Sequence, residues 1–336
     1  MPELGAAELL AGAIVVSLNA YVLLAGADFG GGVWDLLATG PRRARQREVI
    51  AHAIGPVWEA NHVWLILVVV LLFTCFPAVF SRLAIALHIP LTLVLVGIVL
   101  RGSAFTFRSY GGEDAPSQRR WGRVFAIASL VTPLVLGICV GAIAAGRVVP
   151  PSGAGFAADY LHPWVSPFTV SVGVFTLGLF AFIAAVYLTM ESADAEVQED
   201  FRRRALWAGA AVFAAALTTL LLAWEAAPLV WHGLITSRRA LPLQFLTGIA
   251  ATLALWALWR RRYPLARAAA AAQVTFILWG WALAQFPWLL PPTLDIRGAA
   301  APAITLKLTL GALGLGALVL FPSLYYLFRV FKSRPQ

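Results

Sequence analysis

Long apolar runs separated by short polar stretches make up most of the chain. A bilayer core about 30 Å thick needs roughly 20 apolar residues per helix. The pattern therefore predicts an all-α polytopic membrane protein with about nine transmembrane helices. They lie near residues 8–37, 49–76, 79–106, 122–146, 166–190, 205–227, 240–259, 268–290 and 303–328. The first three exceed a straight crossing, which indicates tilt or a helical extension past the bilayer.

The basic residues lie between these runs and alternate from one side to the other. With nine crossings, 18 of the 25 Lys and Arg fall on one side. They are Arg42, Arg43, Arg45, Arg47, Arg108, Arg119, Arg120, Arg123, Arg202, Arg203, Arg204, Arg260, Arg261, Arg262, Arg267, Arg329, Lys332 and Arg334. Because cytoplasmic loops carry the excess of Lys and Arg, we expect the N-terminus outside and the C-terminus in the cytoplasm.

Composition excludes a soluble protein. Of the 336 residues, 60% are hydrophobic and only 12% are charged, whereas soluble domains are about 45–50% apolar and about 25% charged. The net charge of +9 lies in short clusters that fit cytoplasmic loop anchors, so no nucleic-acid partner is expected. The two cysteines lie inside apolar runs, which indicates neither a disulfide framework nor a cysteine metal site.

Three ionisable residues lie deep within the first two predicted spans. Asp28 and Glu59 are each about ten residues from the predicted inner side, or roughly 15 Å deep at 1.5 Å per residue. His62 follows Glu59 by three residues and shares its helical face. Such residues are functional candidates because charges in a bilayer are costly. Together they would form a proton relay, a metal or haem ligand set, or a buried polar network; Asp28 could also cap a kink at the glycines that follow it.

Arg101 lies about one and a half turns from the inner end of the third predicted span. It could extend to the interface, or it could be the counter-charge of an inner carboxylate. The pattern alone fits a proton-coupled transporter and a respiratory-chain subunit equally well.

Five segments resemble subunit II of the cytochrome bd-type quinol oxidases. They are LAGADFGGGVWDLL at 24–37, GPVWEANHVWLI at 55–66, LRGSAFTFRSY at 100–110, WALAQFPWLLPP at 281–292 and FPSLYYLFRVFK at 321–332. They occur in the family's order and run from one end of the chain to the other. Five collinear matches are far more specific than any single one.

The resemblance implies a single membrane domain of two four-helix bundles, at about 1–150 and 160–336, the second with an additional helix. It implies a homologous subunit I that holds two haems b and one haem d and takes quinol as substrate. It also implies a bacterial inner-membrane location. Subunit II would support assembly, shield the haem cluster and contribute to proton uptake from the cytoplasm, without a catalytic centre of its own. The resemblance also allows two further components in the complex: a small single-helix subunit, and a structural quinone or lipid.

Carried over to this sequence, the resemblance places four residues at positions that matter for the proton path or the haem cluster: Asp28, Trp58, Glu59 and Arg101. The family usually has Asp where this chain has Glu59. It often has an acid at the positions of Ala25 and Thr106. A neutral or acidic polar residue is common at the position of His62, for which we favour a proton-path role over haem ligation.

Other functions compete with a quinol oxidase subunit. The electron donor could be different, for example cytochrome c. A proton-coupled transporter would have inverted repeats with helices broken in both halves, but the acid-bearing, glycine-interrupted helix occurs only in the first half. A purely structural scaffold would differ only in tolerating the loss of Glu59.

Overall fold

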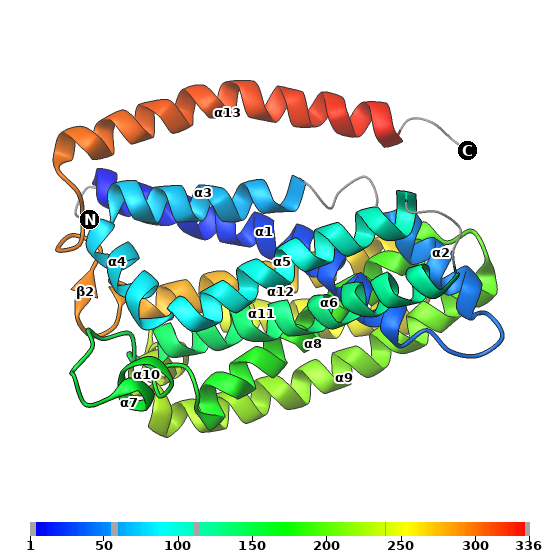
Figure 1. Ribbon diagram of the computed structural model, residues 1–336, viewed down its shortest axis with the longest axis horizontal. Coiled ribbons are helices and arrows are strands. Elements are labelled where there is room, and N and C mark those ends of the chain that lie inside the picture. The colour runs from blue at the N-terminus through cyan, green and yellow to red at the C-terminus, as the bar shows by residue number, and fades with distance from the viewer. Residues whose placement is uncertain (1–4, 55–59, 111–114, 239, 333–336) are drawn as a thin grey trace.

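The computed structural model describes residues 5–54, 60–110, 115–238 and 240–332, and most of them are helical (Figure 1). The longer helices are α1 (Ala6–Leu36), α3 (Ala60–Cys75), α5 (His88–Tyr110), α6 (Ala115–Ala144), α8 (Pro167–Glu191), α9 (Ala195–Ala226), α11 (Leu241–Trp259), α12 (Tyr263–Gln285) and α13 (Ala303–Lys332). The short elements are α2 (Arg43–Ile54), α4 (Pro77–Ala86), α7 (Phe156–Tyr160), α10 (Pro228–Thr236), β1 (Trp288–Leu290) and β2 (Leu294–Asp295).

Within these described ranges, eight helices are long and apolar enough to cross a membrane. A ninth crossing results if the bent pair α3–α4 counts as one span. The predicted all-α polytopic class is therefore confirmed. The proposed division into two bundles stays a prediction, because α8 packs against both α1 and α6 and so joins the two halves.

The predicted boundaries of the second and third spans were wrong. Residues 49–54 belong to the separate polar helix α2, and α3 is described from Ala60 onward. At its other end α3 stops at Cys75, and α4 turns away by 118°. Pro77 is the first residue of α4, where its missing N–H costs no helical hydrogen bond. The apolar run continues through the break between α3 and α4, so hydropathy alone did not reveal it.

Helix α1 lies at the centre of the packing, against α3, α6 and α8. Glycines on α1 allow α8 to approach closely: a Cβ on Gly30 would fall on the backbone carbonyl of Phe180. The Trp34 indole donates a 2.7 Å hydrogen bond to the Ala181 carbonyl oxygen across the same contact. Ser166 caps the start of α8 through a capping box with Thr169.

The helices run along the long axis of the molecule, so its two ends differ (Figure 1). One end carries α4, α7, α10 and the β1–β2 hairpin. The other end carries α2 and the starts of α6 and α9, and we call it the Arg-rich end. Helix α13 lies along one side, next to α3, with Leu308, Leu315 and Leu318 each at least 67% exposed. Apolar side chains exposed in this way fit a lipid or protein environment rather than water.

Candidate functional site: a buried ion pair between α1 and α5

The centre of the site is a buried ion pair. Arg101 on α5 donates from Nη2 to Asp28 Oδ1 at 2.6 Å and from Nη1 to Asp28 Oδ2 at 2.8 Å. Arg101 is 1% exposed and Asp28 is 4% exposed. The sequence left two alternatives for Arg101. In the structure Arg101 is the counter-charge of Asp28, and its side chain does not extend to the membrane interface. Bidentate pairs of this kind fix both side chains in one orientation.

Helix α6 completes the surroundings of Arg101. The guanidinium carbon lies 4.8 Å from the ring centroids of both Phe29 and Phe125. Arg101 Nε donates to Ser129 Oγ at 3.0 Å, and Nη2 also donates to the Asp28 carbonyl oxygen at 3.1 Å. A guanidinium placed between two aromatic faces is stabilised by cation–π attraction, which is stronger away from water. Arg101 thereby connects α1, α5 and α6 deep inside the protein.

Three polar atoms near this pair are buried without a hydrogen-bond partner among the described residues. Asn61 donates from Nδ2 to Asp28 Oδ2 at 3.2 Å, but its Oδ1 has no partner. His62 Nδ1 and Tyr21 Oη are also unpartnered, and the two rings lie 6.5 Å apart. Unsatisfied buried polar groups are uncommon and costly, and they are typical of functional sites.

A second ion pair repeats the first one two helical turns along. Arg108 on α5 donates from both terminal nitrogens to the carboxylate of Asp35 on α1, each at 3.1 Å. Arg47 of α2 lies 3.6 Å from the same carboxylate and donates to the Asp35 carbonyl oxygen. Both pairs are separated by 73 residues, so α1 and α5 run parallel. Asp35 was not among the residues predicted for the site, and Arg108 was predicted only as a basic loop residue. The signal for their pairing is the seven-residue step shared by both helices.

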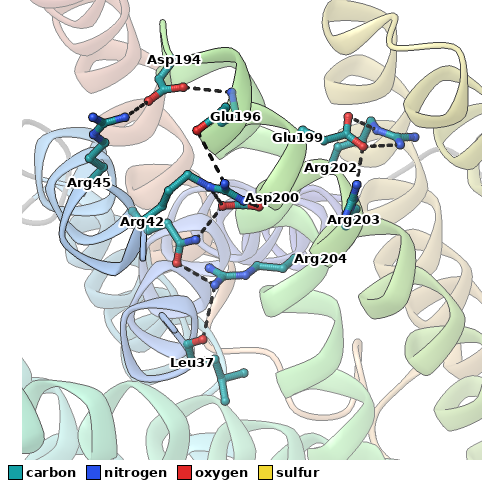
Figure 2. Close-up of polar contacts among 11 residues, drawn as sticks. Leu37, Arg42, Arg45, Asp194, Glu196, Glu199, Asp200, Arg202, Arg203 and Arg204 are labelled. Atoms are coloured by element: carbon teal, nitrogen blue, oxygen red, sulfur yellow. Dashed lines mark hydrogen bonds and ion pairs between the residues drawn. The ribbon is translucent and has the colours of Figure 1, made fainter. Parts of the chain in front are cut away.

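At the Arg-rich end, a polar junction ties α2 to α9 (Figure 2). Asp200 accepts from Arg42 Nε at 2.8 Å, from Arg42 Nη2 at 2.7 Å and from Gln46 Nε2 at 2.8 Å. Arg204 bridges from α9 to the Gln46 side chain at 2.8 Å. The carboxylate of Asp200 raises the pKa of Arg42, so Arg42 stays charged. These contacts place the polar helix α2 across the start of α9.

The same junction continues at the cap of α9. Asp194 is the N-cap and accepts a 2.9 Å hydrogen bond from the Glu196 backbone N–H. This bond, more than the neighbouring Arg45, lowers the pKa of Asp194. Arg45 lies 3.0 Å from the carboxylate (Figure 2). A charged N-cap satisfies a helix donor that would otherwise lack a partner.

The structure thus brings together three of the five residues predicted for the site. Asp28 and Arg101 are in direct contact, and His62 follows Asn61, which binds Asp28. Trp58 and Glu59 lie outside the described residues. Haem ligation by His62 stays a prediction; the Nδ1 atom of its ring is buried within the described part of the chain. Among the described residues, no three His, Cys, Asp or Glu side chains gather as a metal site.

Comparisons with known proteins agree with this architecture. Residues 6–331 match the family described as cytochrome bd terminal oxidase subunit II. A Bacillus subtilis (strain 168) protein, provisionally assigned as a cytochrome bd menaquinol oxidase subunit II, is 21% identical over 321 residues, which are 93% of this chain and 91% of that protein. The cytochrome bd-I ubiquinol oxidase subunit 2 of Escherichia coli (strain K12) is 28% identical over 181 residues, which are 53% of this chain and 46% of that protein.

The fold is also that of a solved structure. A chain of the bd oxidase from Geobacillus thermodenitrificans superposes with a TM-score of 0.81 at 24% identity, covering 98% of this chain and 99% of that chain. The superposition supports the helix arrangement, and the family match extends over nearly the whole sequence. This chain therefore belongs to the cytochrome bd terminal oxidase subunit II family.

Proposed function

We propose that this chain is the accessory membrane subunit of an oxidase that oxidises quinol and reduces oxygen to water. A homologous subunit I would hold haems b and d, which supply the redox chemistry when bound. The present chain would support assembly, shield the haem cluster and conduct protons from the Arg-rich end, which we place in the cytoplasm. Family membership favours this function over a proton-coupled transporter.

The observation that carries the proton-path proposal is the set of unpartnered polar atoms beside a buried ion pair. Oxygen reduction consumes protons, so a route of ionisable groups into the membrane is required. The Asp28 carboxylate oxygens are occupied by Arg101 and Asn61, so we assign Asp28 a holding role. The Nδ1 atom of His62 has no hydrogen-bond partner among the described residues, and we assign proton transfer to His62 and Glu59.

Substitution of the two proton-transfer residues tests this assignment. We expect Glu59→Gln and His62→Phe, each in the complete oxidase, to lower quinol-driven oxygen uptake by about 10–100-fold, because a lost acid–base group costs that much or more. The reduced-minus-oxidised haem spectrum should stay unchanged. His52→Gln is the matched control, because His52 is exposed on α2.

Two results would contradict the proton-path role. Full turnover in Glu59→Gln would indicate that the chain acts only as a structural scaffold. Loss of a haem band in His62→Phe would make His62 a haem ligand. The donor is tested separately, by comparing oxygen uptake of the unmodified complex with reduced quinol and with reduced cytochrome c. We expect reduced quinol to support turnover. Oxygen uptake with reduced cytochrome c but not with quinol would make cytochrome c the proposed electron donor.

A further inference from the structure

A basic cavity of about 340 Å³ lies at the Arg-rich end, between α1, α2, α5 and α6. Its charged lining consists of Asp35, Arg43, Arg47, Arg108, Arg119 and Arg123. Five guanidinium groups therefore surround one carboxylate in the described part of the chain. Arginine presents several N–H donors in a planar fork that matches the oxygens of a phosphate.

The arginines of this cavity divide into two groups. Arg47 and Arg108 are held by Asp35, which they contact within 3.6 Å. Arg43, Arg119 and Arg123 form no ion pair with any residue in the described ranges. Three cations that gather around one space repel one another. An anion in the cavity would relieve that repulsion and use their donors.

A neighbouring cavity of about 250 Å³ at the same end differs, because two arginines of its lining have acidic partners. Its lining includes Arg42, Arg203 and Asp200. There Arg42 is bound by Asp200, and Arg203 lies 3.3 Å from Glu199 (Figure 2). The Arg42–Asp200 pair holds the start of α2 to α9, whereas the Arg203–Glu199 pair lies within α9. The larger cavity has no comparable set of acidic partners among the described residues.

The border of the larger cavity is apolar and faces outward. Leu36 lines the cavity and is 43% exposed. Next to the lining residues, Phe107 stacks on Trp121 with ring centroids 4.6 Å apart, and Phe107 is 51% exposed. One turn and a half beyond Trp121, Ile127 is 60% exposed on α6. Trp and exposed apolar side chains beside a basic cluster are typical of the membrane interface.

We propose that this cavity binds the phosphate head group of an anionic membrane lipid, with the acyl chains along the apolar face of α5 and α6. Basic pockets between transmembrane helices recognise acidic lipid head groups by this combination of charge and depth. Arg43, Arg119 and Arg123 donate to the phosphate oxygens, while the Asp35 pairs keep the wall of the cavity in place. The bound lipid would join α2 to α6, because Arg43 lies on α2 and Arg119 and Arg123 lie on α6.

Lipid retention by the purified oxidase tests the proposal without reference to turnover. The probe is phosphatidylglycerol added to the delipidated complex, with phosphatidylcholine as the zwitterionic comparison, and binding is counted by native mass spectrometry. The test variant is Arg119→Gln with Arg123→Gln. We expect its affinity for phosphatidylglycerol to fall about 30-fold, because each basic residue near an anionic head group contributes about fivefold.

Arg120→Gln is the matched control, since Arg120 is exposed on the same helix and does not line the cavity. It should leave phosphatidylglycerol binding within about twofold of the unmodified complex. An equal loss in the control would show diffuse attraction and overturn the site. Unchanged binding in the double variant would also overturn it. Displacement of the lipid by inorganic phosphate would assign the cavity to a soluble anion instead.

Discussion

Replacing Gly30 with alanine is expected to prevent stable assembly of the subunit. The new Cβ would fall on the carbonyl oxygen and carbon of Phe180 and also meet the Cβ of Ala184. Backbone atoms cannot rotate away as a flexible side chain can, so α1 and α8 would have to separate. Overpacking a tight core contact costs about 1–3 kcal/mol and occasionally more, and here it acts on the central helix pair.

The measurement is the yield of assembled oxidase in mild detergent, together with its midpoint of thermal unfolding. Gly12→Ala is the matched control on the same helix, because none of the described residues has an atom within 4 Å of a Cβ at Gly12. That change should be neutral or slightly stabilising, since alanine is the better helix former. Equal yields of the two variants would show that α1 and α8 do not pack as closely as described.

The second large effect is expected from Arg101→Met. The substitution removes the cation that neutralises Asp28 and leaves a buried carboxylate that keeps the hydrogen bond from Asn61 but loses its counter-charge. Breaking a buried pair from one side costs about 3–5 kcal/mol, because the remaining charge is no longer compensated by an opposite charge. We expect a strongly lowered midpoint of thermal unfolding and loss of complex from the membrane.

The double variant Asp28→Leu with Arg101→Met separates charge burial from packing. Since it leaves no unpaired charge, it should recover more than half of the stability lost in Arg101→Met. Arg45→Met, which breaks the more exposed pair with Asp194, should have little effect and serves as the control. A double variant less stable than Arg101→Met would show that the pair itself stabilises the fold beyond charge compensation.

Much of the architecture was predictable because a membrane imposes simple rules. Run lengths gave nearly all the long helices, since each must span a fixed apolar thickness. Asp28, His62 and Arg101 stood out as candidates because polar groups are rare at such depth. The five collinear segments pointed to the family that the comparisons then established.

Breaks within apolar runs were not predictable in the same way. The 118° turn after Cys75 lies within continuous apolar sequence. Hydropathy averages over a window and does not register where backbone hydrogen bonding stops. Pro77 was a signal for the turn, but proline also occurs inside helices, as Pro133 does in α6.

The sequence by itself determined the class of protein, and it predicted about nine crossings and the ionisable residues that lie deep within them, because these depend on hydrophobicity and distance along the chain. Tertiary structure decided which charges meet. Arg101 pairs with Asp28, and Arg108 with Asp35, only because α1 and α5 run parallel side by side. The arginine-lined cavity likewise forms only where the ends of four helices meet. Pairing across helices depends on rotation and register, which residue spacing along a single helix does not specify.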